Sequence, residues 1–195
     1  MTQPYRAARA ALAAAGLVLA GCANPEPALY TLAPQPGPPA GPAALGKIRS
    51  VELRRIGLAG YIDRPGIVRA ASPYRLNVTQ DARWAAPIGP MLENLIAEDL
   101  TRRLPGVAVF TASSGMSAQA DRVFQIDIQR LDADPAGDVV LQAQVAIFDR
   151  NSGDPASIRS FQIAQTPATP AVEDQVAAMS LAVAILTDHL VQMLR

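Results

Sequence analysis

The chain has 195 residues, enough for one domain with a core, because a domain of this size buries about two thirds of the surface of its unfolded chain. Hydrophobic residues make up 50% of it and charged residues 17%, with equal numbers of basic and acidic side chains. This composition argues against intrinsic disorder. A neutral chain without a run of Lys or Arg is also a poor partner for nucleic acid.

The first 21 residues have the three parts of a bacterial export signal. Arg6 and Arg9 form a short basic region, an apolar stretch runs from about residue 10 to 19, and small residues precede a cleavage point. The apolar stretch is too short to span a membrane, which takes about 20 residues. It ends in Leu-Ala-Gly-Cys at positions 19–22, which resembles the lipobox of bacterial lipoproteins.

Cys22 is the only cysteine in the chain. The lipobox resemblance implies that its thiol carries a diacylglyceryl group and that its amine is acylated after cleavage, with palmitate as the expected fatty acid. Several acyl chains together give stable anchoring. Ala23, rather than an aspartate, follows the cysteine, which resembles lipoproteins sorted to the outer membrane, so we expect an anchor at the periplasmic face of the cell outer membrane. The alternatives are an export signal with an incidental cysteine, or a buried free thiol.

A proline-rich region separates the anchor from the body of the chain. Tyr30-Thr31-Leu32 is a short β-prone segment, and residues 33–45 are so rich in proline and glycine that they favour an extended conformation. We interpret residues 33–45 as a spacer or a long surface loop. The expected organisation is a signal peptide (1–21), an acylated N-terminus with a Pro-rich tether (22–46) and a single α/β domain (47–195).

The first half of the body contains short strands and one helix. Strands are predicted near residues 48–56, 67–68 and 76–78, and the Arg64-Pro65 step favours a structured loop at Tyr61–Pro65. Apolar residues recur every three or four positions in residues 87–103. This period predicts an amphipathic helix that ends at Leu-Pro-Gly, and a short strand at 107–110 follows.

The second half contains the clearest signal in the chain. Residues 123–131 and 139–147 both alternate between apolar and polar side chains, and Asp-Pro-Ala-Gly-Asp between them predicts a hairpin turn. A third strand is expected at 158–163. Thr169-Pro170 predicts the N-cap and first residue of a final amphipathic helix. The whole order predicts an α/β domain in which two long helices cover a mixed, largely antiparallel sheet.

The sequence contains few residues in arrangements that are typical of catalysis. His189 is the only histidine, which excludes a two-histidine zinc motif, and we expect it to be a solvated helix residue. An acylated Cys22 cannot act as a nucleophile, and the chain has no Gly-x-Ser-x-Gly elbow. Glu98 and Asp99 are adjacent and point apart on a helix, which favours solvation over paired carboxylate catalysis. We therefore expect no enzyme activity, no metal and no cofactor.

Binding to a partner is the remaining expectation. An exposed Tyr61-Ile62 pair would be an unusual feature to leave without a partner on a loop. Trp84, the only tryptophan, opens the predicted first helix, where a hydrophobic staple is the alternative to a partner contact. The candidate partner-binding residues are Tyr61, Ile62, Asp63, Arg64, Pro65 and Trp84.

Taken together, these segments resemble the PqiC (YmbA-like) family of ABC-type transport auxiliary lipoproteins. The likeness lies in the lipobox, Tyr30-Thr31-Leu32, the Tyr61–Pro65 segment, and Arg-Trp-Ala-Ala-Pro at 83–87 opening a helix that ends in Leu-Pro. It is densest from Tyr30 to Phe110. Where the family commonly has leucine, this chain has Ile62.

The resemblance implies a fold like the amino-terminal domain of TolB, an anticodon-binding-domain-like arrangement. It also implies a lipoprotein subunit of an MCE-type lipid transport system that connects two membranes, contributes to membrane integrity, docks on the MCE component and self-associates. Two other functions stay open: a periplasmic carrier that binds a lipid in its own pocket, and an accessory lipoprotein of outer-membrane assembly or secretion. Fold alone does not choose between them.

Overall fold

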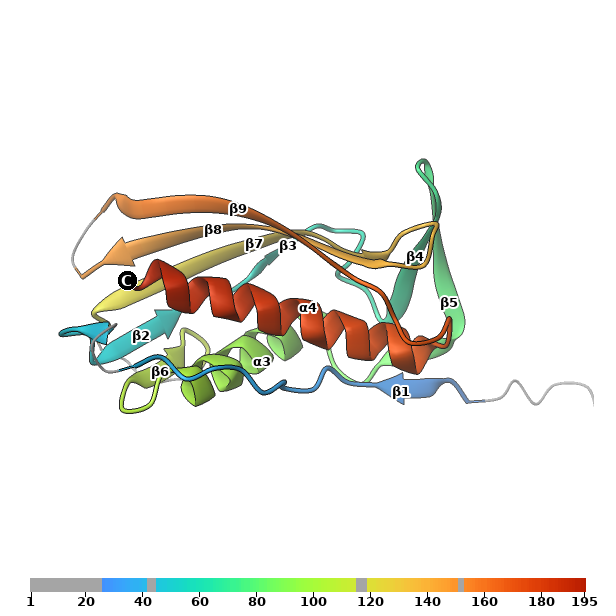
Figure 1. Ribbon diagram of the computed structural model, residues 1–195. Coiled ribbons are helices and arrows are strands. Elements are labelled where there is room, and N and C mark those ends of the chain that lie inside the picture. Colours follow the sequence, from blue (N-terminus) through green and yellow to red (C-terminus); the bar gives the residue numbers. More distant parts are fainter. Residues whose placement is uncertain (1–25, 42–44, 115–118, 151–152) are drawn as a thin grey trace, which may run out of the picture.

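The computed structural model describes residues 26–41, 45–114, 119–150 and 153–195. Among these residues, nine strands form one mixed sheet, and two long helices, α3 (Ile88–Arg103) and α4 (Val172–Met193), lie on the same face of it (Figure 1). This arrangement confirms the predicted α/β architecture. The finer likeness to the TolB domain stays a prediction.

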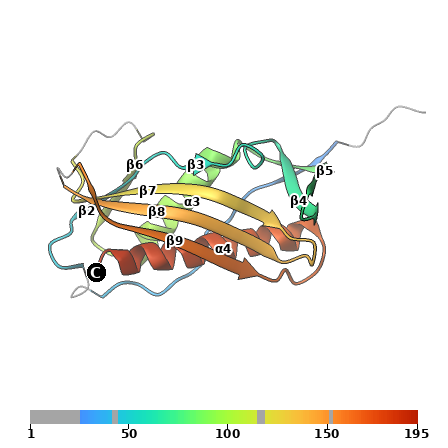
Figure 2. The ribbon, with the colours of Figure 1, turned by 90° about the horizontal axis from the view of Figure 1, so that it is seen from above.

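The strands differ greatly in length, and the longest three follow one another in the chain. In chain order the strands are β1 (Ala28–Tyr30), β2 (Ser50–Leu53), β3 (Gly57–Leu58), β4 (Gly66–Ser72), β5 (Arg75–Trp84), β6 (Ala108–Thr111), β7 (Arg122–Ala133), β8 (Val139–Asp149) and β9 (Pro155–Gln165). The last three form the antiparallel meander that the alternating pattern predicts (Figure 2).

Strand β7 pairs with more strands than any other in the described sheet. One of its edges pairs antiparallel with β8 along nearly its whole length. Its other edge pairs in turn with β2, β3 and β4, all in parallel. β4 forms an antiparallel hairpin with β5, β1 adds in parallel to the last residues of β5, and β6 pairs with β2. The longest pairings are therefore antiparallel, with short parallel additions.

The core lies between the meander and the two helices. Phe124, Ile126 and Ile128 alternate along β7 and are at most 1% exposed, because every second side chain of a strand points to the same face. The turn to β8 is built as its sequence predicts. The Asp134 carboxylate accepts hydrogen bonds from three successive backbone N–H groups, and Gly137 supplies the φ of 101° that the turn requires.

Helix α4 starts later than the sequence indicates. Its N-cap is Ala171, so the predicted cap at Thr169 is wrong. The Thr169 hydroxyl instead accepts a hydrogen bond from the Ala171 N–H, and the carbonyl of Pro170 accepts one from the Arg69 guanidinium. Among the described residues, α4 alone is long and apolar enough to cross a membrane, but its apolar side chains mostly pack inside the domain.

Residues 31–41, here named the strap, run along both helices in an extended conformation (Figure 1). Four of its N–H groups donate to the helices, at 2.7 to 3.3 Å: Leu32 to Met91 Sδ, Ala33 to Ser180 Oγ, Gln35 to Asp99 Oδ1 and Ala40 to the Arg103 carbonyl. Leu32 and Ala40 are buried. The described part of the proline-rich region is therefore packed on the surface of the domain, which agrees with the second of the two interpretations, a long surface loop.

Candidate functional site

The segment 59–65, between β3 and β4, is a tight turn held by its own backbone. Ile62 N–H donates to the Ala59 carbonyl at 2.9 Å, and Arg64 N–H donates to the Ile62 carbonyl at 2.7 Å. Trp84 N–H then donates to the Pro65 carbonyl at 2.8 Å, which fastens the segment to the end of β5. The predicted structured loop thus exists, and it brings Trp84 next to Pro65.

Tyr61 and Ile62 are both used by the fold. The Tyr61 hydroxyl donates to Asp132 Oδ2 at 2.7 Å, and Asp132 also pairs with Arg130 at 3.0 Å. Burial, together with this hydrogen bond, raises the pKa of the Tyr61 phenol far above its ordinary value. Ile62 is 2% exposed and belongs to the core. The prediction of an exposed Tyr61-Ile62 pair is therefore wrong for Ile62, because the turn directs that side chain inward.

Trp84 is a core residue at the end of a strand. It is 6% exposed, and it pairs with Tyr30 of β1. The helix α3 that follows has Pro87 as its N-cap, so Trp84 lies too far from the helix to be a hydrophobic staple. Its burial instead fixes where the chain leaves the sheet and enters α3.

The turn at residues 59–65 and the segment that runs from the end of β5 to the start of α3 enclose an open hollow of about 300 Å³. Its wall is mostly apolar, with two charged side chains at exposed positions of the turn. It is lined by Asp63, Arg64, Pro65, Trp84, Ala86, Pro87 and Ile88. The volume lies at the small end of ligand pockets, and an apolar floor with a charged rim suits the insertion of a side chain from another protein. We call this feature the docking hollow.

The docking hollow contains four of the six candidate binding residues from the sequence and three that the sequence did not indicate. Asp63, Arg64, Pro65 and Trp84 line it, whereas Tyr61 and Ile62 do not: Tyr61 hydrogen-bonds to Asp132 and Ile62 is part of the core. Ala86, Pro87 and Ile88 were missed, because small and apolar residues before a helix carry no binding signal of their own. Only the turn packed against them makes them a surface.

The bond from Tyr61 to Asp132 predicts a measurable dependence of stability on pH. Tyr61→Phe should lower the free energy of unfolding by about 1–3 kcal/mol at pH 8, because a buried carboxylate loses a donor. A raised phenol pKa stabilises the fold fully below the ordinary value of about 10. The advantage of the wild type should therefore shrink as pH rises above about 10. Urea unfolding from pH 8 to 11 measures this, and equal stability at pH 8 would contradict it.

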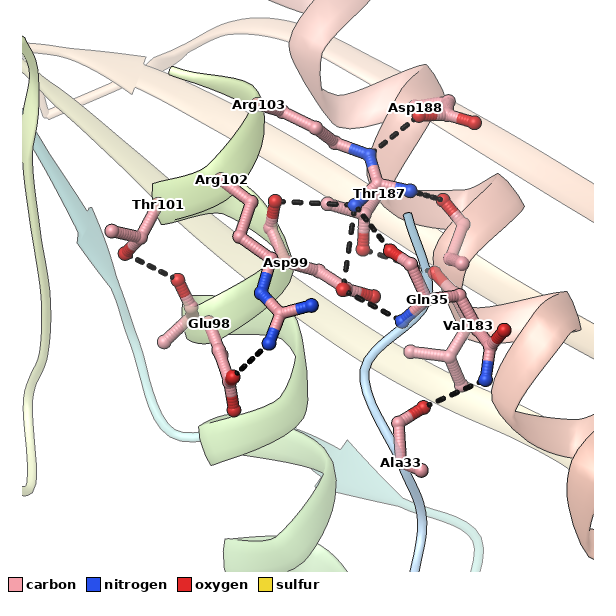
Figure 3. A network of polar contacts seen from close by, with 12 residues as sticks. Ala33, Gln35, Glu98, Asp99, Thr101, Arg102, Arg103, Val183, Thr187 and Asp188 are labelled. Atoms are coloured by element: carbon pink, nitrogen blue, oxygen red, sulfur yellow. Dashed lines mark hydrogen bonds and ion pairs between the residues drawn. The ribbon is translucent and has the colours of Figure 1, made fainter. Parts of the chain in front are cut away.

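A second polar cluster lies inside the domain, where α3, α4 and the strap meet (Figure 3). Arg103 is fully buried, donates to Asp188 Oδ1 at 2.6 Å and lies 3.4 Å from Asp99 Oδ1. Its guanidinium also donates to the carbonyls of Gln35, Asp99 and Ala184. The cluster therefore ties three separate segments of the chain together.

This cluster is structural, although it contains a perturbed acid. Burial raises the pKa of the Asp99 carboxyl, and the Arg103 guanidinium opposes that rise. Asp99 is fully buried, so the prediction of a solvated Asp99 is wrong, while Glu98 is exposed and pairs with Arg102 as expected of a surface residue. A methyl group on Gly37 would collide with the Arg103 guanidinium, so the strap approaches this closely because it has a glycine there.

Metal-ligating side chains do not cluster in the described part of the chain. No group of three or more His, Cys, Asp or Glu side chains there could hold a metal ion. His189 stacks on Phe161 with ring centroids 4.9 Å apart, so it is partly covered and not simply solvated.

The fold is a packed α/β domain with an open, mostly apolar hollow on its surface. A family model described as the ABC-type transport auxiliary lipoprotein component matches residues 30–191. The chain belongs to this family. It is accordingly an auxiliary lipoprotein of ABC-type transport, and membership implies that it is anchored to a membrane. Cys22, the predicted attachment site, lies outside the described residues.

Solved structures share the fold at low sequence identity. An uncharacterised protein is 15% identical with a TM-score of 0.72, covering 88% of this chain and 100% of its own. A Xanthomonas campestris protein of the DUF330 family is 21% identical with a TM-score of 0.69, covering 84% of this chain and 91% of its own. No curated protein sequence is significantly similar to this chain.

Proposed function

We propose that this protein is the outer-membrane-anchored, periplasmic adaptor subunit of an MCE-type intermembrane lipid transport system, where it contributes to membrane integrity. Membership in the auxiliary lipoprotein family supports the transport role. Leu-Ala-Gly-Cys at 19–22 supports acylation of Cys22, and Ala23 supports sorting to the outer membrane. The resemblance to the PqiC family supports the MCE-domain component as partner and self-association of the subunit.

The docking hollow is the observation that carries the adaptor role. Its wall is mostly apolar and open to solvent, and the turn that forms it is held in place by the buried Ile62 and by the bond from Tyr61 to Asp132. A rigid surface loses little conformational entropy on binding, which favours a lasting protein contact. A hollow of this kind is suited to receive one apolar anchor residue of a partner.

A carrier that encloses a whole lipid is supported less well. Such a carrier needs an apolar cavity, and the space between the helices and the sheet is filled by side chains such as Phe124, Leu92 and Leu186, each fully buried. The larger hollow beside Tyr74, of about 520 Å³, is open and of mixed lining, with charged side chains such as Arg130 and Asp132 among apolar ones. The amphipathic stripes of α3 and α4 are thus accounted for by core packing.

Crosslinking in native membranes, followed by purification of the tagged protein, tests the proposal. We expect the acylated protein to fractionate with the outer membrane and to recover an MCE-domain protein. A Cys22→Ala version exported with a cleavable signal should be soluble and recover much less of that protein, because it is no longer held at the membrane. Recovery of noncovalently bound phospholipid without any transporter component would contradict the adaptor function, and fractionation with the inner membrane would contradict the proposed location.

A further inference from the structure

The anchor leaves the domain very little freedom to move away from the membrane. The strap is fixed on the helices, and β1 is paired with the end of β5 from Ala28↔Ala82 onward. Only five residues, Ala23 to Pro27, therefore separate the acylated Cys22 from β1, so six residue-to-residue steps join the cysteine to Ala28. At 3.3–3.6 Å per residue, this leash reaches about 20 Å when fully extended.

The strands next to the leash form one end of the molecule. Figures 1 and 2 both place β5 and the start of β1 at the end opposite the C-terminus. Because β1 cannot be more than about 20 Å from the bilayer, this end of the domain must lie near the lipid surface. The opposite end, which holds the start of β9, is not held near the lipid surface by this leash.

The same end carries most of the exposed apolar side chains. The described residues have six large hydrophobic side chains that are strongly exposed, and four of these lie on β1 or on the β4–β5 hairpin. They are Leu29 (67% exposed), Tyr74 (99%), Leu76 (46%) and Val78 (41%). Exposing several large hydrophobic side chains to water at one site is unfavourable. The clustering of these four side chains at the anchored end therefore indicates that another surface covers them.

The chemistry of this end suits the interfacial layer of a bilayer. Tyrosine and arginine combine an apolar body with a polar tip, and both side chains are favourable at the depth of the lipid head groups. Arg75 and Arg83 are exposed on β5, and Asp81 on the same strand partly balances their charge. Apolar insertion, rather than net charge, would therefore provide most of the attraction.

The geometry points to a membrane-docking face formed by β1 and the β4–β5 hairpin, in which Leu29, Tyr74, Leu76 and Val78 contact the lipid head-group layer. This inference rests on the proposed acylation of Cys22. Weak intrinsic affinity is sufficient, because a leash of about 20 Å makes the second contact intramolecular, with an effective concentration in the millimolar range. Trp84 is the last residue of β5 and lines the docking hollow, so the docking hollow lies close to the anchoring membrane. The transport partner must therefore contact this protein near that membrane.

Site-specific fluorescence tests the membrane-docking face. The acylated protein is reconstituted in vesicles of phosphatidylethanolamine and phosphatidylglycerol, with one new cysteine labelled by an environment-sensitive fluorophore. The label goes only to that position, because acylation occupies the thiol of Cys22, the sole native cysteine. Leu29→Cys and Leu76→Cys report on the face, and Ala156→Cys, exposed at the start of β9, is the control.

Lipids with a nitroxide near the head group should quench the labels at 29 and 76 at least twofold and leave the label at 156 unchanged. Equal quenching at all three positions would overturn the inference. The labels at 29 and 76 could also report an apolar environment that is lost when the protein is diluted in lipid. That result would overturn the inference, because it would show that a second copy of the protein covers this face. Mass spectrometry of the same sample separates the two proposals: an unmodified Cys22 would refute the anchor and the face together, whereas an acylated Cys22 with unquenched labels would refute the face alone.

Discussion

Arg103→Ala should lower the free energy of unfolding by about 3–5 kcal/mol, because it leaves the fully buried Asp99 carboxylate without its cation. The chain provides a matched control one residue away. Arg102 also pairs with an acid one helical turn back, Glu98, but both side chains are about half exposed. Arg102→Ala should therefore cost only about 0.3–0.5 kcal/mol. Urea unfolding of both variants measures the difference, and equal losses would contradict the structural role of Arg103.

The pH dependence of this loss distinguishes charge from lost packing. The Asp99 pKa is already raised by burial and should rise further without Arg103. A raised carboxyl pKa favours the folded state below the ordinary value of about 4, and that contribution is lost as pH rises through the folded-state value. The deficit of Arg103→Ala should accordingly shrink as pH falls from neutral toward about 4, and adding Asp99→Asn should restore part of the stability at pH 7. A deficit independent of pH would show that packing alone is responsible.

Ala86→Trp should reduce recovery of the MCE-domain partner at least tenfold, because an indole at this position fills the docking hollow. A tenfold loss corresponds to about 1.4 kcal/mol of binding free energy, a modest share of a protein contact. Ala85→Trp is the control. Ala85 is equally exposed and adjacent, but its side chain does not line the docking hollow. Both variants should unfold at the temperature of the wild type, since both positions lie on the surface.

Local pattern was sufficient to predict the meander and both helices. Buried side chains alternate from Phe124 to Ile128 of β7 and from Leu141 to Ile147 of β8, because one face of the sheet packs on α4. The irregular step in the β7–β8 pairing after Ile128 changes this pattern. It leaves Leu131, Asp132 and Ala133 all buried, and it thereby places Asp132 where Tyr61 can reach it.

The strap and the buried cluster depend on contacts between distant residues. The Arg103 guanidinium joins atoms of the strap and of α4, which lie 68 and more than 80 positions away. One signal was present in the sequence: Asp99 and Arg103 fall on the same helical stripe as Leu92 and Ile96, which indicates burial of both charges. Glycine at position 37 gave no such signal, because only the position of Arg103 explains it.

The docking hollow was only partly predictable for a similar reason. The sequence pointed to residues 61–65 and to Trp84, yet it could not show that Ile62 turns inward while Asp63 and Arg64 stay exposed. That division depends on the turn held between Ala59 and Trp84. Tertiary packing therefore decides which residues of the segment support the hollow and which line it.

The most direct test of the account is the amount of MCE-domain protein recovered from native membranes with Ala86→Trp, measured by quantitative mass spectrometry relative to Ala85→Trp. Both proteins must be acylated at Cys22 and present at wild-type level in the outer membrane, so that only the docking hollow differs. If the partner binds in the docking hollow, the recovery ratio of Ala86→Trp to Ala85→Trp should be below about one tenth. Equal recovery with the two variants would show that the partner does not use the docking hollow.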